Sequence, residues 1–225
     1  MNTRYYQVAK VINRVQPEFI VRTGIFDKTG KEIDKDVIRE IFYSNCYGVG
    51  ENEIKDEIIV DLGAHIGVFS VYAALCGAKI VYAYEPLKSN YDLLVKNIAV
   101  NNLQNKIIPI QKAITGQKGK AKIVANSRDS YIYENGDEEV NTITLYDIFV
   151  ENKIPYAGLM KVDIEGSEYE MFERATPNVL QKIKMIVGEY HKGDLGNLIN
   201  KVKETHNVRT FGKKDLGQFE ARRYN

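Results

Sequence analysis

Residues 58–70, IIVDLGAHIGVFS, constrain the fold more than any other stretch of the chain. An apolar run ends in Asp61, two glycines bracket a turn, and a segment compatible with a helix follows directly. The run is too short for a buried helix and is bounded by glycine, so it predicts a central parallel strand. Gly63 and Gly67 allow a sharp turn at the start of the helix, where a ligand can approach exposed backbone amides.

A second apolar run, residues 80–84, ends in Glu85. A carboxylate at the tip of the adjacent strand can accept hydrogen bonds from both hydroxyl groups of a ribose. The glycine spacing is G-x-x-x-G rather than the G-x-G-x-x-G of dinucleotide-binding turns, and Asp61 would repel a pyrophosphate. The same anion suits the amino group of a zwitterion such as S-adenosylmethionine, which favours that ligand over NAD. The alternative is an ordinary strand-to-helix turn that binds nothing.

Three motifs, VDLGAHIGVFS, YAYEP and KVDIEGSE in that order, resemble the class I S-adenosylmethionine-dependent methyltransferases, specifically the FkbM type. The resemblance covers roughly residues 57–191, and the D-I-E-G-S-E element is its most specific part. It implies an α/β fold with a Rossmann-like, doubly wound sheet of seven strands, and S-adenosyl-L-methionine as the methyl donor. Relatives of this type act on hydroxyl groups of sugars, polyketides and other natural products.

Short apolar runs alternate with helical segments from residue 57 onward, which predicts a parallel sheet covered by helices on both faces. Two runs near the end of the chain predict an antiparallel hairpin at the sheet edge. Ligands bind at the carboxyl ends of the strands in such sheets. The expected strands are 58–62, 80–84, 107–111, 159–163 and 184–190, the helices 67–76, 88–101, 144–152, 167–174 and 194–205, and the hairpin strands 208–211 and 218–222.

The first 50 residues are expected to form an N-terminal cap segment ahead of a methyltransferase domain of residues 51–225. Apolar spacing predicts a helix over 3–15, a strand over 19–25, and a second helix capped by Asp34. We expect the cap to pack near the strand ends and to help form the acceptor pocket rather than the donor pocket. The alternative is that the cap segment only packs against the sheet and stabilises it, without contributing to a binding pocket.

Composition narrows the class of protein. The 225 residues have a net charge of +1 and are 44% hydrophobic, which is typical of one soluble globular domain without a basic excess for nucleic acid. No apolar stretch or signal peptide is evident, so we expect no transmembrane segment and a cytoplasmic location. Cys46 and Cys76 lack metal-ligand spacing and suggest reduced thiols.

The segment between the third and fourth strands is the least regular part of the chain. Residues 121–125 are expected to form a short strand, and residues 126–139 either an exposed insertion over the site or a flexible loop.

The methyl donor is expected to bind at the ends of the first strands. Glu85 is the candidate ribose ligand, and Pro86 a wall of the adenine slot. Gln111, at the third strand end, is a candidate partner for the adenine amine, although a solvated strand end explains it equally well. His65 is expected to pack beside the ligand. The full set of expected donor-binding residues is Asp61, Gly63, Ala64, His65, Gly67, Glu85, Pro86, Gln111 and Asp163.

The segment KVDIEGSE places several carboxylates at a strand end, where each loses hydration and repels its neighbours. Asp163 corresponds to the position that lies beside the reactive methyl in this fold, and Glu165 is assigned to the site with it. Glu168 is expected in the first turn of the next helix, where the helix dipole favours a negative charge.

The fifth strand ends in Glu189-Tyr190-His191. A histidine beside carboxylates at a strand tip can have a pKa held near neutrality, which suits a general base. Taken alone, a single histidine is more often a surface or core residue with its hydrogen bonds satisfied than a catalytic residue. No metal-ligand cluster is evident, although the carboxylates could hold a divalent ion, which chelation would reveal. The expected catalytic residues are His191, Asp163, Glu165 and Glu189.

Together these features predict methyl transfer from S-adenosylmethionine to a hydroxyl group of a sugar, glycolipid or natural-product acceptor. The sulfonium is a good leaving group, so the protein mainly aligns the nucleophile and removes a proton. A methyltransferase that acts on the amino group of a nucleobase would be expected to have the motif N-P-P-aromatic at its fourth strand. This chain has D-I-E-G at that position, which argues against that class of enzyme. Two alternatives stay open: an RNA ribose methyltransferase, because basic residues cluster in the tail, and a nucleotide-binding module without catalysis. The balanced charge makes a small-molecule or glycan acceptor the expected partner, rather than nucleic acid.

Overall fold

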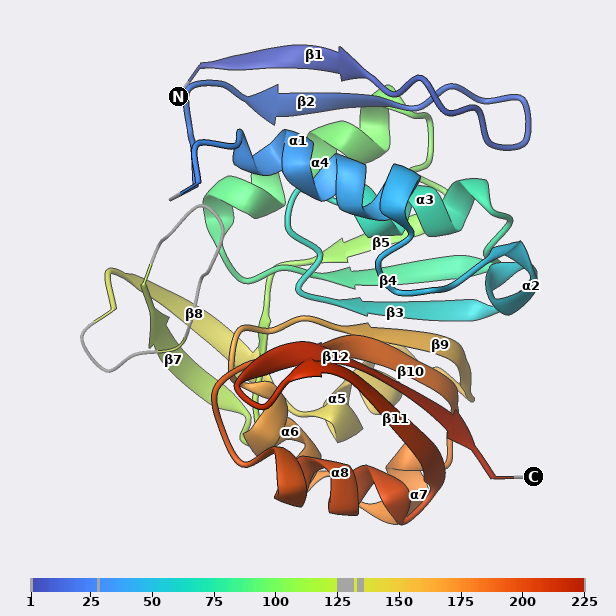
Figure 1. Ribbon diagram of the computed structural model, residues 1–225, viewed down its shortest axis with the longest axis vertical. Coiled ribbons are helices and arrows are strands. Elements are labelled where there is room, and N and C mark those ends of the chain that lie inside the picture. The colour runs from blue at the N-terminus through green and yellow to red at the C-terminus, as the bar shows by residue number, and fades with distance from the viewer. Residues whose placement is uncertain (1, 28, 125–131, 133–135, 225) are drawn as a thin grey trace.

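A seven-stranded sheet forms the centre of the computed structural model, which describes residues 2–27, 29–124, 132 and 136–224. Its strand order is β11-β12-β10-β9-β3-β4-β5 (Figure 1). The central five strands are parallel, and the last two form the antiparallel edge. The bounds are β3 (Ile58–Leu62), β4 (Ile80–Tyr84), β5 (Ile107–Ile110), β9 (Ala157–Val162), β10 (Ile183–Tyr190), β11 (His206–Lys213) and β12 (Leu216–Arg223).

This sheet confirms the doubly wound, Rossmann-like class and the C-terminal hairpin. Every residue of β3 and β9 is buried, because helices cover both faces of the sheet. That burial explains why the sequences of these strands read as continuous apolar runs rather than as alternating ones. Strands β3, β4 and β5 all end on the left in Figure 1, and this edge carries the candidate site.

Helices pack on both sides of the sheet, as Figure 1 shows. The helices expected after residue 57 are all present, each within about two residues of the expected bounds. None of the helices that the structure describes is long and apolar enough to cross a bilayer. One face carries α3 (Val68–Leu75) and α4 (Lys88–Val100), the other α5 (Leu145–Glu151), α6 (Glu168–Arg174), α7 (Pro177–Leu180) and α8 (Leu195–Lys203), and a short α2 (Glu51–Ile54) precedes β3.

A separate three-stranded sheet follows β5. It consists of β6 (Ala113–Ile114), β7 (Gly119–Ile123) and β8 (Glu138–Ile143), in the order β6-β8-β7. Strand β7 confirms the short strand expected at 121–125, although it begins two residues earlier. The expected insertion or loop at 126–139 lies mostly outside the described residues.

The helix expected over residues 3–15 is wrong. Residues Thr3–Gln7 form β1, which pairs antiparallel with β2 (Glu18–Arg22). Asn13 and Arg14, with φ values of 47° and 67°, adopt left-handed conformations in the connection between the two strands. The apolar spacing fits a helix, but pairing with β2 satisfies the backbone of β1 instead. Long-range pairing of this kind commonly overrides local propensity.

The second N-terminal helix is confirmed as α1 (Ile33–Arg39), which continues into the π-helical turn η1 (Glu40–Ser44). Asp34 does not cap this helix. The N-cap residue is Glu32, and Asp34 is the second residue of the helix, buried against Arg22. The physical reason is that a buried guanidinium requires an anionic partner more strongly than an exposed helix end requires a cap.

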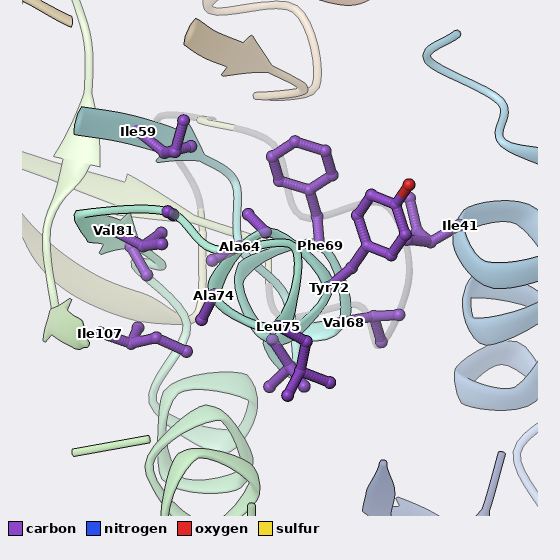
Figure 2. Close-up of a cluster of buried hydrophobic side chains, with 14 of the residues drawn as sticks. Ile41, Ile59, Ala64, Val68, Phe69, Tyr72, Ala74, Leu75, Val81 and Ile107 are labelled. Carbon is purple, nitrogen blue, oxygen red and sulfur yellow. The ribbon is translucent and has the colours of Figure 1, made fainter. Parts of the chain in front are cut away.

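A hydrophobic core joins the N-terminal segment to the sheet. Figure 2 shows Val68, Phe69 and Tyr72 of α3 on the side that faces Ile41 of η1. Phe42 is fully buried, and its ring meets those of Phe19 and Tyr72 edge-on at centroid distances of 5.8 and 5.6 Å. The N-terminal segment therefore shares its core with α3 rather than forming a core of its own.

Candidate active site

A cavity of about 390 Å³ opens at the carboxyl ends of the central strands. This volume is within the range of small-molecule sites. The N-terminal segment supplies part of its wall through Ile41, Cys46 and Tyr47. Nine of the residues expected at the site line it, namely Gly63, Ala64, His65, Glu85, Pro86, Asp163, Glu165, Glu189 and His191.

The backbone amides of the glycine turn are bonded within the protein. Gly63 and Ala64 both donate to the carbonyl oxygen of Tyr84, at 3.0 and 2.8 Å. The amide of His65 donates to a carboxylate oxygen of Glu85 at 2.8 Å. The expectation that these amides are exposed to a ligand is therefore wrong for the three residues, because β4 and its terminal carboxylate satisfy them.

The two glycines are required by packing inside the protein. Gly63 has a φ of 78°, and a Cβ there would lie 1.8 Å from the backbone oxygen of Asp163. Gly67 has a φ of 88°, and its Cβ would lie 2.5 Å from a methyl carbon of Leu94. Any larger residue would push the turn away from the neighbouring segments. Gly67 does not line the cavity, which differs from its expected role in donor binding.

Glu85 is a buried carboxylate in the cavity wall. It accepts hydrogen bonds from the amide of His65, the amide of Leu87 at 3.0 Å and the side chain of Asn90 at 3.3 Å. Burial raises the pKa of Glu85 to about 7, although these three hydrogen bonds act to lower it. The structure thus places an ionisable acceptor where the ribose ligand is expected.

Asp61 does not reach the cavity wall. Its side chain is fully buried, accepts a hydrogen bond from the Ser70 hydroxyl at 2.6 Å, and lies 3.4 Å from the Lys161 ammonium. Burial lowers the pKa of Lys161, but Asp61 and Asp163 outweigh this effect and raise it. Lys161 also donates to the carbonyl oxygen of Gly63 at 2.6 Å. The anion expected to bind the amino group of the ligand instead holds a lysine behind the glycine turn.

Gln111 also lies away from the cavity. Its side chain is exposed and donates to the carbonyl oxygen of Pro86 at 3.4 Å. The chain turns after β5, so that Lys112 and Ala113 line the cavity in its place. Pro86 lines the cavity as expected.

Asp163 and Glu189 form a carboxylate pair at the ends of β9 and β10. Asp163 accepts a hydrogen bond from the Tyr47 hydroxyl at 3.2 Å and lies 3.7 Å from Lys161. Burial, and then the charge of Asp163, raise the pKa of Glu189 to about 7. Gln218 donates to Glu189 at 3.4 Å. Glu189 is therefore a carboxyl group that titrates near neutral pH.

His191 lies between two carboxylates. Its Nε2 is 3.1 Å from Glu165, and its Nδ1 is 3.1 Å from Glu168. Burial opposes the charge on the ring, but the hydrogen bond to Glu168 and the charges of both carboxylates raise the pKa of His191 to about 9. The pKa lies above the expected value near neutrality, because both ring nitrogens contact carboxylates directly. At neutral pH His191 is a cation.

Glu168 has a larger role than its position in the sequence indicates. It lies in the first turn of α6 as expected, but it is fully buried. Besides the His191 ring, it accepts hydrogen bonds from the His191 amide at 2.9 Å and the Gly166 amide at 2.8 Å. It therefore fixes the end of β10 against the segment that follows β9.

One group of side chains could hold a divalent ion. Asp163, Glu189 and His191 each present a donor atom, all within 4.8 Å of one another. No local spacing indicates this group, because its members come from two strands. A bound ion would compete with Lys161 for Asp163 and with Glu165 for His191, so the charges already present fit an ion poorly.

The profile of the FkbM methyltransferase domain matches residues 61–213, more than half of the 225 residues. The chain belongs to the FkbM methyltransferase family. This FkbM-type enzyme is 27% identical to the hexuronic acid methyltransferase AglP of Haloferax volcanii, over 76% of this chain and 69% of AglP. It is 25% identical to the 31-O-demethyl-FK506 methyltransferase FkbM of Streptomyces tacrolimicus, over 72% of this chain and 76% of that protein.

The fold of this FkbM-type methyltransferase also resembles a solved structure, an rRNA methylase of Streptococcus thermophilus. The TM-score is 0.54 at 10% identity, and the match covers 83% of this chain and 98% of the other. At this identity the likeness shows the fold alone, which is that of class I methyltransferases. Family and relatives together make the chain an S-adenosylmethionine-dependent methyltransferase.

Proposed function

We propose that this enzyme transfers a methyl group from S-adenosylmethionine to a hydroxyl oxygen of a sugar, glycolipid or natural-product acceptor. The observation that carries the proposal is one cavity lined both by the buried carboxylate Glu85 and by the carboxyl group of Glu189, which titrates near neutrality. The names of the two relatives, which specify a hexuronic acid and 31-O-demethyl-FK506, support an oxygen-rich acceptor.

The donor fits the β4 side of the cavity. Glu85 accepts hydrogen bonds from the ribose hydroxyls, and Pro86 borders the adenine. When bound, S-adenosylmethionine supplies a methyl group on a positively charged sulfur. Strands β4 and β10 are separated by β3 and β9 in the sheet. At about 4.8 Å per strand, Glu85 and Glu189 are on the order of 14 Å apart, which leaves room for a nucleoside between them.

The proton of the acceptor hydroxyl passes to Glu189. A general base works best when its pKa is close to the working pH, and Glu189 meets this condition whereas His191 does not. His191 remains protonated and offsets the charges of Glu165 and Glu168. Asp163, oriented by the Tyr47 hydroxyl, positions the acceptor.

The RNA alternative gains little support from the tail. Arg222 donates to Glu220 at 2.7 Å, and Arg223 donates to the carbonyl oxygen of Gln181 at 2.7 Å. Both cations are therefore partly committed to contacts within the protein rather than being arranged for phosphates. A gel-shift experiment with structured RNA is expected to show no specific binding, and a specific complex would favour the alternative.

The test is a panel of hydroxylated sugars, glycolipids and polyketides incubated with the enzyme and methyl-labelled donor. Incorporation into a member of the panel is expected. Glu189→Gln should lower incorporation about 10²- to 10⁴-fold while leaving affinity for S-adenosylhomocysteine intact. Glu204→Gln, at the exposed end of α8, is the matched control and should keep the wild-type rate. Normal incorporation by Glu189→Gln would assign the proton to another group.

A further inference from the structure

An arginine from the N-terminal segment reaches the donor side of the cavity from behind. Arg22, the last residue of β2, is 2% exposed. Its Nε and Nη2 donate to the carboxylate of Asp34 at 3.0 and 2.5 Å. A buried cation without an anion would be strongly destabilising, so Asp34 accounts for the charge of Arg22. Asp34 does not account for the rest of the guanidinium.

Two further contacts of the guanidinium are made to residues of the cavity wall. Its Nη1 donates to the side-chain oxygen of Asn90 at 2.7 Å, and its Nη2 lies 2.7 Å from Nε2 of His65. Both of these residues in turn bond to Glu85. The His65 amide donates to one carboxylate oxygen at 2.8 Å, and the Asn90 side chain donates to the other at 3.3 Å.

The chemistry of the guanidinium fixes the orientation of both partners. Arginine has only donors, so Asn90 must turn its oxygen toward Arg22, which points its NH₂ group at Glu85. For the same reason Nε2 of His65 must be an unprotonated acceptor, so that the ring proton is on Nδ1. His65 also has a φ of 52°, an uncommon conformation for a residue other than glycine. The contact with Arg22 and the bond to Glu85 hold it in that conformation.

We propose that Arg22 is a positioning residue of the donor site, which acts through Asn90 and His65 to hold Glu85 in the orientation that binds a ribose diol. The inference rests on the proposed role of Glu85 in donor binding. It makes the N-terminal segment part of the donor site, although every donor motif lies after residue 57. Asp34 satisfies only part of the five donors of the guanidinium, and two of the acceptors that face the remaining donors are neighbours of Glu85.

The test uses the full chain, with S-adenosylhomocysteine as the probe in calorimetry. Arg22→Lys keeps the positive charge beside Asp34 but loses the fork that reaches Asn90 and His65 together. We expect its dissociation constant to rise about tenfold, the equivalent of one charged hydrogen bond. Arg4→Ala is the matched control: Arg4, on β1 of the same segment, pairs with Glu32 at the surface and should not change the affinity.

A double-mutant cycle separates positioning from general stability. If Arg22 acts through Glu85, the loss caused by Arg22→Lys should shrink to less than about threefold in the Glu85→Gln background. The same tenfold loss in both backgrounds would overturn the proposal, as would wild-type affinity of Arg22→Lys. A wild-type protein that fails to bind the probe would instead refute the proposed donor site itself.

Should Arg22→Lys not fold, Asn90→Ala tests the link that Asn90 makes between Arg22 and Glu85, with the Arg22–Asp34 pair intact. It should also weaken binding of S-adenosylhomocysteine about tenfold, with a smaller effect in the Glu85→Gln background. Unchanged affinity in Asn90→Ala, measured in a protein whose melting temperature shows it to be folded, would overturn the proposal.

Discussion

Replacing Glu85 by glutamine should weaken donor binding in a pH-dependent way. Glutamine keeps the size of the side chain but removes the charge, and its single oxygen can accept from only one of the amides of His65 and Leu87, which donate to separate oxygens of Glu85. Hydrogen bonds to charged groups are stronger than neutral ones by about 1 kcal/mol each. Two ribose hydroxyls therefore give a loss of about 2 kcal/mol, or roughly 30-fold in affinity, where Glu85 is ionised.

The pKa of about 7 sets where this loss appears. At pH 8 about nine-tenths of Glu85 is ionised, and at pH 6 only about one-tenth is, so the wild-type advantage should fall from roughly 30-fold to roughly threefold. The assay is calorimetry of S-adenosylhomocysteine at the two pH values. Asp92→Asn, on the exposed face of α4, is the control and should match the wild type at both. Equal affinities of wild type and Glu85→Gln at pH 8, or a ratio that does not change with pH, would refute this reasoning.

Three further outcomes are expected. With the donor saturating, so that titration of Glu85 does not limit binding, the pH profile of kcat should rise through about pH 7 as Glu189 loses its proton. It should fall through about pH 9 as His191 loses its own, so that Glu189→Gln removes the acidic limb and His191→Gln the alkaline one. Treatment with a chelator should leave turnover unchanged, because Lys161 and Glu165 already engage Asp163 and His191; a rate restored by added Mg²⁺ or Mn²⁺ would contradict this. Phe42→Ala should lower the free energy of unfolding by about 3–5 kcal/mol in urea titrations, since Phe42 is fully buried between Phe19 and Tyr72; a loss below about 1 kcal/mol would mean that the N-terminal segment is not part of the core.

The central sheet was predictable because its signals are local. Each buried strand is a short apolar run that ends in a turn or a charged residue, and the strand ends carry most of the cavity residues. The N-terminus was not predictable in the same way. Residues 3–7 are mostly exposed, so their pattern carries little information about packing, and their strand exists only through pairing with β2.

The electrostatics of the site depend on contacts that no local pattern encodes. Glu168 and His191 are 23 residues apart, and Arg22 and His65 are 43 apart. Because a second carboxylate contacts its ring, His191 is a cation rather than a base. Because Asp61 pairs with Lys161, its side chain does not line the cavity. One usable signal was missed: Arg22 follows the apolar run FIV, and a cation at the end of a buried strand indicates a buried partner.

The most direct test of the account is to identify the atom that receives the methyl group. A donor with a ¹³C-labelled methyl should be incubated with the hydroxylated acceptor panel, and the products examined by NMR. The expected result is a carbon signal of an O-methyl ether, formed by the wild type and strongly reduced with Glu189→Gln. A label on nitrogen or carbon, or firm binding of S-adenosylhomocysteine without transfer to any hydroxylated acceptor, would contradict it.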